Sequence, residues 1–266
     1  MRQIFPEPGD PIGPADPLIQ AGPIDPGDAA AADLVAALAK IYAYPDRLWV
    51  KANFVASVDG AVTAEGKSAG LSGAADRLVF TVLRSLADVV VAGAGTVRAE
   101  RYRQAQPREV WQQLRAGRPE APPIAVVTRR LEVDLSERLF GHGPGLARTI
   151  VITTELAGED RLREASRVAD VVVAGRETVP AKAAVDALVA RGHRKILVEG
   201  GPTLLGQLAA EHLLDELCLT LSPVLEGGHA AGRLTARRGP TELTAMRLAS
   251  VLEDDGFLLS RYIRAA

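Results

Sequence analysis

An acid stands at the end of a buried strand in the segment KILVEGGPTLLG. Residues 195–198 form an apolar, strand-like run, Glu199 follows, and two glycines lead into a helical pattern. Burying a carboxylate costs free energy unless a partner compensates its charge. Two interpretations of Glu199 therefore stay open: an ion-pair or helix partner inside the fold, or a functional group that faces a ligand.

Two glycine-containing turns could bind an anion. Gly93 and Gly95 leave the run VVVAG, with Thr96 as a possible cap, and the second turn is the pair Gly200 and Gly201. Glycine lets a backbone approach a ligand closely, and free N–H groups at a helix start attract phosphate. Each turn alone could be only a tight connection. Neither fits the G-x-G-x-x-G fingerprint of an ordinary Rossmann domain.

Polar residues in the segment ANFVASVDGAVTAEGKSAGLSGAADR are further candidates. Asp59 precedes Gly60, a pair frequent in hairpin turns, so its role is either structural or functional. Ser68 lies in the loop before a helix and could cap it. Arg84 lies near the end of that helix, where it either reaches a ligand or extends its charge to water.

The elements that must position these residues follow an α/β pattern. Helical segments at 72–86, 180–192 and 201–214 are interspersed among the strand-like runs LWVKANFVAS, ADVVVAG, PIAVVT, TIVITT, DVVVAG and KILVEG. Such runs predict a mixed, mainly parallel sheet flanked by helices. Open sheets of this class bind ligands beyond the carboxyl ends of their strands, where Glu199 and both glycine turns fall.

The last part of the chain contains three strand-like runs without a helix between them: ELCLTLSPVL, TAMRLASVLED and GFLLSRYIRA. They predict antiparallel C-terminal strands. An exposed strand edge at 217–221 or 257–263 would need protection, which favours a dimer contact there.

The N-terminal segment differs in composition from the rest. Seven of the 17 prolines fall in the first 26 residues, which predicts an extended arm over 1–27. A helical pattern follows, with Asp28 as a possible N-cap and Pro45 beyond its end. We expect a single domain over 28–266.

Composition limits the classes of function. The 31 basic and 33 acidic side chains leave a net charge of −2, so no overall field favours nucleic acid or an anionic membrane. The one cysteine, Cys218, lies in an apolar run, which predicts a core residue and neither a disulfide framework nor a metal site. With no apolar stretch of roughly 18 to 20 residues and no leader pattern, we expect a cytoplasmic protein.

Several motifs, in order, resemble the pyrimidine reductase of riboflavin biosynthesis, the reductase half of the bacterial deaminase/reductase. They are SVDG, the G-x-S loop at 66–68, LRS followed by ADVVVAGAGTVRAE, and ILVEGGPTLLG. The resemblance covers residues 48–264 and implies a dihydrofolate-reductase-like fold, NADPH as cofactor and a homodimer. One cysteine cannot supply the H-x-E and P-C-x-x-C set of a zinc deaminase, so we expect a stand-alone reductase.

The resemblance implies cofactor contacts residue by residue, with the segment 201–207 around the pyrophosphate. Arg129 and Arg130 follow the run AVVT, where guanidinium groups suit the 2′-phosphate of NADPH; a solvated loop pair is the alternative. The implied cofactor-binding residues are Val55, Ala56, Gly70, Gly93, Gly95, Thr96, Glu100, Arg129, Arg130, Gly200, Gly201, Pro202, Thr203, Leu204 and Leu205.

The resemblance also implies a reaction: hydride transfer from C4 of NADPH to C1′ of 5-amino-6-(5-phosphoribosylamino)uracil, which opens the sugar to a ribityl chain. Glu199 and Asp59 are the acids expected near the reacting atoms. The implied substrate-binding residues, for this phosphorylated pyrimidine, are Asn53, Ser68, Arg84, Arg103 and Glu199.

Two departures from the family pattern concern the substrate side. The bacterial enzymes carry lysine where Asn53 stands, and Lys51 lies two positions earlier on the same strand face. The usual acidic pair with proline after GTVRA is replaced by ERYR.

Two other functions remain open on this scaffold. One is a dihydrofolate reductase or another pterin or pyrimidine reductase, although 4% aromatic residues make a stacking cleft for a pteridine less favourable. The other is a catalytically inactive nucleotide-binding module, against which the presence of Glu199, Asp59 and Ser68 argues.

Overall fold

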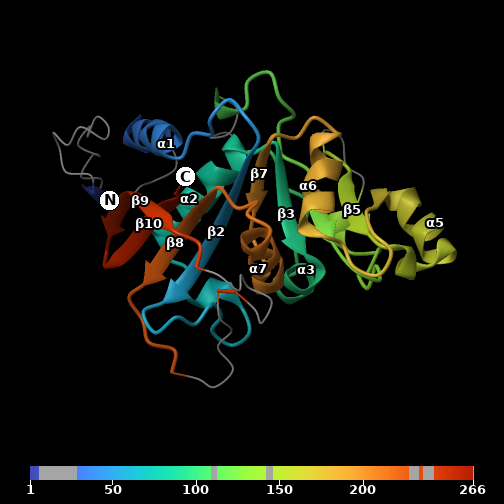
Figure 1. Ribbon diagram of the computed structural model, residues 1–266. Coiled ribbons are helices and arrows are strands. Elements are labelled where there is room, and N and C mark those ends of the chain that lie inside the picture. The colour runs from blue at the N-terminus through green and yellow to red at the C-terminus, as the bar shows by residue number, and fades with distance from the viewer. Residues whose placement is uncertain (6–28, 109–112, 142–145, 228–233, 236–242, 266) are drawn as a thin grey trace.

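A ten-stranded sheet organises the chain (Figure 1). The computed structural model describes residues 1–5, 29–108, 113–141, 146–227, 234–235 and 243–265. The strand order is β1-β9-β10-β8-β2-β7-β3-β4-β5-β6. The strand bounds are β1 Arg2–Phe5, β2 Trp49–Ser57, β3 Val89–Gly93, β4 Ile124–Val127, β5 Thr149–Thr153, β6 Ala169–Val173, β7 Lys195–Val198, β8 Glu216–Ser222, β9 Met246–Asp254 and β10 Phe257–Arg264.

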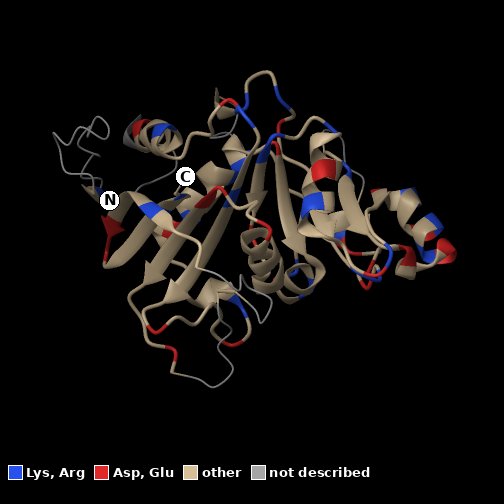
Figure 2. Ribbon diagram, viewed as in Figure 1, with Lys and Arg blue, Asp and Glu red and all other residues tan. Residues whose placement is uncertain are grey.

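Helices connect the parallel strands and flank the sheet. They are α1 Ala29–Ile41, α2 Ala74–Leu86, α3 Ala94–Ala99, α5 Glu159–Val168, α6 Ala181–Val189 and α7 Pro202–Ala210, with short 3-10 turns at Ser68–Gly70, Arg138–Phe140 and Glu155–Ala157. Figure 2 shows both signs of charge along α5 and the loops, while most of the sheet is uncharged. Within the described segments, no helix has the length and apolar character that a membrane span requires.

The predicted mixed, mainly parallel sheet is confirmed, with three differences in detail. β8 pairs parallel to β2 on one side and antiparallel to β10 on the other, so the pairing changes from parallel to antiparallel at β8 and stays antiparallel through β10, β9 and β1. Helices α3 and α5 were not predicted, because one is short and the other is strongly polar. Residues 2–5 of the expected arm form β1 on the edge beside β9; residues 6–28, including the possible N-cap Asp28, lie outside the described part.

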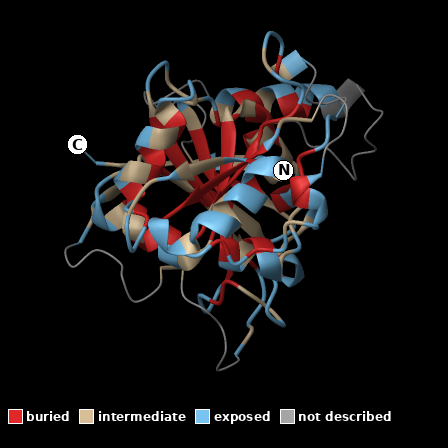
Figure 3. Cartoon of the chain, turned by 90° about the vertical axis from the view of Figure 1, so that its right-hand side faces the viewer, coloured by how far each residue is buried: buried red, intermediate tan, exposed pale blue. Residues whose placement is uncertain are grey.

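Two apolar layers hold the helices against opposite faces of the sheet (Figure 3). On one face Leu38 of α1 and Leu83 of α2 belong to the same cluster as Val90 and Leu197. On the other face α6 and α7 pack against alternate strand residues, among them Val50. Because successive strand side chains point to opposite faces, Trp49, Lys51, Asn53 and Val55 of β2 all lie on the α1 and α2 face.

A buried ion pair occupies the first part of this row. Lys51 Nζ lies 3.2 Å from Glu216 Oε1 and donates to the Tyr42 carbonyl at 2.6 Å. Arg261 Nε and Trp49 Nε1 also donate to the Glu216 carboxylate, at 2.6 and 2.8 Å. Burial lowers the pKa of Lys51, although the Glu216 charge opposes that effect. Lys51 is thus engaged inside the fold, and Asn53 is the next residue on the same face, two positions nearer the carboxyl end of β2.

Candidate functional site

The two glycine turns meet because β3 and β7 are neighbouring parallel strands. The Glu199 N–H donates to the Val91 carbonyl, and the Gly93 N–H donates to the Gly200 carbonyl, both at 2.9 Å. Thr96 packs directly against the second turn: a Cβ on Gly201 would lie 2.8 Å from Thr96 Oγ1, and one on Gly200 would lie 3.0 Å from it. The backbone therefore needs glycine at both positions to pass this close to α3.

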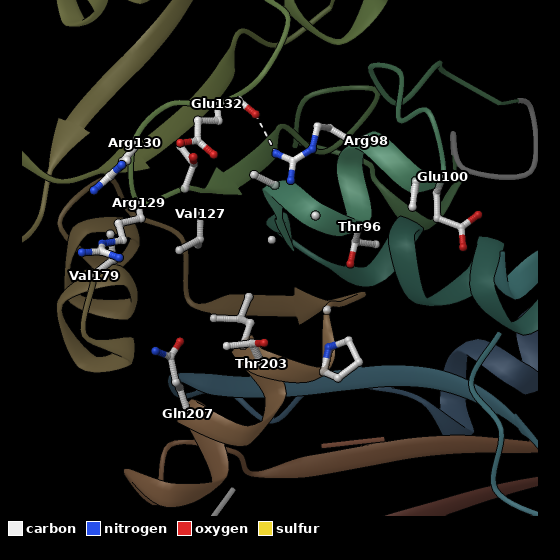
Figure 4. Close-up of a pocket in the computed structure, with 18 of the residues that line it drawn as sticks. Thr96, Arg98, Glu100, Val127, Arg129, Arg130, Glu132, Val179, Thr203 and Gln207 are labelled. Carbon is white, nitrogen blue, oxygen red and sulfur yellow. Dashed lines mark hydrogen bonds between the residues drawn. The ribbon is translucent and has the colours of Figure 1, made fainter. Parts of the chain in front are cut away.

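A cavity of about 810 Å³ opens beside these turns. Figure 4 shows Thr96 and Glu100 on one side, Arg129 and Arg130 on the opposite side, and Gln207 of α7 below. Gly201 precedes the first turn of α7, and Pro202 occupies its first position, as predicted. The cavity has the size of a site for a small molecule or cofactor.

Three arginines concentrate positive charge in this first cavity. Arg129 and Arg130 line it directly after β4, and Arg129 Nε donates to the Glu177 carbonyl at 2.8 Å. Arg98 of α3 also lines it, with its Nη1 donating to the Glu132 carbonyl at 2.6 Å (Figure 4). Arg98 was not predicted, because its direction depends on a six-residue helix that the sequence pattern did not reveal. Glu100 and Glu132 also line this cavity, so three arginines less two glutamates leave a formal charge of +1, which suits an anionic ligand.

A second cavity of about 380 Å³ adjoins the first. Asn53 and Val55 of β2 line it, together with the loop before α2, the first turns of α2 and Glu199. Glu100 fixes that loop by accepting the Ser68 N–H at 2.7 Å. The residues that line both cavities are Thr63, Thr96, Glu100, Gly201 and Pro202. Two ligands, one in each cavity, would therefore meet at this shared wall.

Glu199 forms an internal ion pair at the edge of the second cavity. Arg84 Nε and Nη2 donate to its two oxygens at 2.7 and 2.6 Å, and the Tyr102 hydroxyl donates to Oε2 at 2.8 Å. The Glu199 side chain is 1% exposed and that of Arg84 is 14% exposed. The structure thus confirms the ion-pair interpretation of Glu199, although the residue also lines the cavity.

This network fixes the protonation of its donors. Burial first, and then the Glu199 charge, raise the pKa of the Tyr102 hydroxyl well above its ordinary value. Burial would lower the pKa of Arg84, but the Glu199 carboxylate more than offsets it, so the net shift is upward. Both groups therefore remain protonated donors at neutral pH. Tyr102 lies in the segment that departs from the family pattern, and no role was predicted for it.

The first turns of α2 bring Asp76, Arg77 and Phe80 to the second cavity. Ser72 Oγ donates to Asp76 Oδ2 at 2.5 Å, and Arg77 Nη1 donates to the Ser72 carbonyl at 2.9 Å. Asp76 is only 6% exposed. These residues were not predicted. A usable signal was present, since Asp76 is an acid in the first turn of a helix with a strongly apolar face.

The structure brings together most of the predicted site residues. The cofactor candidates that line the first cavity are Gly93, Gly95, Thr96, Glu100, Arg129, Arg130, Gly201, Pro202, Thr203 and Leu204, and those that line only the second are Val55 and Gly200. The substrate candidates that line the second cavity are Asn53, Ser68 and Glu199. The candidates that line neither cavity are Ala56, Gly70, Leu205, Arg84, Arg103 and Asp59.

The contacts of Asp59 favour its structural interpretation. Ser57 Oγ donates to its carboxylate, and so do the backbone N–H groups of Glu226, at 3.3 Å, and Gly227, at 3.0 Å. The Ser57 hydroxyl and these two backbone donors lower the pKa of Asp59 to about 2. Asp59 is therefore ionised at neutral pH, and it joins the turn after β2 to the loop after β8.

The close approach of Thr96 to the second turn predicts a steric coupling. Gly201→Ala should lower the free energy of unfolding by about 1 to 3 kcal/mol, because the new methyl group overlaps Thr96 Oγ1. Thr96→Ala should relieve part of that loss, so the double variant should be more stable than the sum of the single effects. Denaturant unfolding of the four proteins measures this coupling.

Gly95→Ala is the matched control, since a Cβ there meets no atom within 4 Å. We expect it to leave stability unchanged or slightly raised, because alanine favours helix. A Gly201→Ala protein as stable as the Gly95→Ala protein would contradict the close packing.

Comparison with known proteins agrees with this geometry. Residues 48–258 match the family described as RibD C-terminal domain. The chain is similar to a 2,5-diamino-6-ribosylamino-4(3H)-pyrimidinone 5′-phosphate reductase of Archaeoglobus fulgidus, with 34% identity over 68% of this chain and 83% of that protein. A protein of the same name from Methanothermobacter thermautotrophicus is 30% identical over 76% of this chain and 90% of its own.

A solved structure supports the same grouping. The crystal structure of a pyrimidine reductase-like protein from Corynebacterium diphtheriae superposes with a TM-score of 0.75 at 29% identity, over 82% of this chain and 92% of that one. The family match over residues 48–258 includes both glycine turns and Glu199. This chain belongs to the RibD C-terminal domain family.

Proposed function

We propose that this protein is an NADPH-dependent reductase of riboflavin biosynthesis that converts the ribosyl group of a phosphorylated aminopyrimidine to ribityl. The observation that carries the proposal is the pair of cavities that share a wall at Thr96, Glu100 and Gly201. One has the size for a dinucleotide and three arginines on its wall, and the other is smaller and combines apolar walls with the polar side chains of Asn53 and Ser68. The names of the two archaeal relatives support the same reaction class.

The first cavity fits a nicotinamide dinucleotide. Its wall at Gly201 admits no side chain beside Thr96, so a phosphate can approach the backbone where α7 begins. We assign the pyrophosphate to this turn and the 2′-phosphate to Arg129 and Arg130. When bound, the cofactor supplies the hydride, and the chain orients the acceptor and excludes water.

The second cavity receives the pyrimidine substrate in this proposal. Asn53 and Ser68 line it at positions where each can contact a polar ligand. Arg84 does not line it, because the guanidinium is bound by both oxygens of Glu199. We therefore give Arg84 and Glu199 a positioning role: together they fix the Tyr102 hydroxyl and the adjoining wall.

The direct test offers the purified protein NADPH with three acceptors: the 2,5-diaminopyrimidinone ribosyl phosphate, the 5-aminouracil ribosyl phosphate and dihydrofolate. We expect NADPH oxidation with an aminopyrimidine and a ribityl product by mass spectrometry. Turnover of dihydrofolate alone would support the pterin reductase instead. Absence of turnover with every acceptor would indicate a catalytically inactive binding module.

Preference for NADPH should depend on Arg129 and Arg130. Replacing both with alanine removes charge-assisted bonds to the 2′-phosphate, each worth about 1.5 to 3 kcal/mol, so NADPH affinity should fall steeply. NADH affinity should change little, and Arg163→Ala on α5 is the control for lost surface charge. Equal losses for NADPH and NADH would refute the assignment.

Glu199→Gln should affect both stability and catalysis. It leaves Arg84 without its counter-charge, which should lower the free energy of unfolding by about 3 to 5 kcal/mol. Loss of the fixed wall should also lower kcat/KM by about 10- to 150-fold, with NADPH affinity almost unchanged.

Glu216→Gln is the matched control for this variant, because Glu216 is a buried acid that pairs with Lys51 and Arg261 and does not line either cavity. We expect a similar loss of stability with kcat/KM preserved. Equal loss of kcat/KM in the two variants would mean that Glu199 acts only through stability.

We also propose a homodimer, but not through a strand edge. The expected exposed edge at 217–221 or 257–263 is wrong: β8 and β10 are paired on both sides, and the outermost strands of the sheet are β1 and β6. Instead, Leu217, Leu219 and Leu221 are partly exposed on the face of β8 opposite α2, and none of the described helices lies in front of β8 in Figure 1. A second copy would bury this apolar face.

Sedimentation velocity at micromolar concentration should show a dimer for the unmodified protein and a monomer for Leu219→Arg. Val173→Arg is the control, because Val173 is an exposed apolar residue of β6 at the far end of the sheet. An unmodified protein that sediments as a monomer would contradict the proposal.

A further inference from the structure

We propose that Asp76 reads the pyrimidine ring and selects a 2-amino-4-oxopyrimidine over a uracil. The assignment rests on the proposed function, because it states which of the two aminopyrimidines the second cavity takes. The two compounds differ at ring position 2, where one carries an amino group and the other an oxygen. A residue that distinguishes the two compounds must therefore present either a hydrogen-bond acceptor, which favours the 2-amino group, or a donor, which favours the 2-oxygen.

Asp76 presents a free acceptor to the second cavity. It is 6% exposed and lines the cavity from the first turn of α2. Oδ2 accepts the Ser72 hydroxyl at 2.5 Å, whereas Oδ1 has no hydrogen-bond partner among the described residues. Among the described residues, no basic side chain forms an ion pair with Asp76. A carboxylate this deeply buried needs compensation, which a donor-bearing ligand would supply.

The other two acids of the second cavity, Glu199 and Glu100, are less suited to bind the ring. Both oxygens of Glu199 accept from Arg84, and Oε2 also accepts from Tyr102. Glu100 Oε1 accepts the Ser68 N–H at the wall shared with the first cavity. Asp76 is therefore the carboxylate of this cavity that is best placed to recognise a ring.

The two rings present different hydrogen-bonding groups to a carboxylate. A 2-amino-4(3H)-pyrimidinone places N3–H and the 2-amino group side by side, so two donors face the two acceptor oxygens of a carboxylate. In a uracil the 2-oxygen replaces the amino group and would face the carboxylate as a second acceptor. A site built to bond a donor rejects the analogue that lacks it, because its buried acceptor is left unpaired.

A purely structural role for Asp76 makes a different prediction. An acid in the first turn stabilises a helix, and the bond from Ser72 fixes that turn. In that case loss of the charge should lower stability and leave the ratio between the two substrates unchanged. The substrate ratio therefore separates the two roles, whatever the change in stability.

The experiment measures kcat/KM for both aminopyrimidine ribosyl phosphates with NADPH, in the unmodified protein and in Asp76→Asn. We expect the unmodified protein to prefer the 2-amino compound. In Asp76→Asn its kcat/KM should fall about 10- to 150-fold, because one acceptor becomes a donor. The uracil compound should lose nothing or gain, since an amide matches its N3–H and 2-oxygen, so the preference should narrow or reverse.

Asp160→Asn is the matched control, since Asp160 is an acid in the first turn of α5, away from both cavities. It should leave the ratio unchanged. The assignment would be overturned if Asp76→Asn left the ratio of the two kcat/KM values unaltered. It would also be overturned if the unmodified protein preferred the uracil compound, and this second result needs no folded variant. When both compounds are reduced with a ratio independent of Asp76, only this assignment fails. When neither is reduced, the proposed function fails with it.

Discussion

The ion pair between Glu199 and Arg84 joins the segments on which the candidate site depends. Glu199 directly follows β7, Arg84 lies in the last turn of α2, and Tyr102 follows α3. A carboxylate that is 1% exposed is stable only while its donors stay in place. The Glu199 charge therefore holds the segments that carry Arg84 and Tyr102 beside the end of β7. This constraint holds α2 beside the strand end that leads into α7, whose first residue, Pro202, lies in the shared wall.

The pairing of the strands brings the two cavities together. Parallel pairing of β3 with β7 brings two glycine turns to one edge, and the close approach of Thr96 leaves backbone rather than side chains facing the first cavity. The second cavity is bounded by β2, α2 and Glu199, so a substrate there would lie against the same wall. In the proposed function, the nicotinamide and the sugar of the substrate would meet where the two cavities adjoin, so that the hydride passes directly between them, and the residues of α2 determine specificity.

The sequence predicted what is local and missed what depends on side-chain direction. Glu199 and the glycine turns stood out because strand, turn and helix start lie within a few residues of one another. The role of Arg84 did not, since its partner is 115 residues away. Asp76 and Arg98 were missed because only the helix orientation shows that they face a cavity. β1 has too short a pattern to be recognised, and its partner β9 lies at the other end of the chain.

The most direct test follows the hydride itself. The protein would be incubated with NADPH that carries deuterium at the transferred C4 position and with the phosphorylated diaminopyrimidinone, and the product would be examined by mass spectrometry and NMR. Direct transfer from C4 of the nicotinamide to the substrate predicts one deuterium at C1′ of a ribityl product. A product without deuterium at C1′, or with deuterium in the pyrimidine ring, would contradict the proposed reaction.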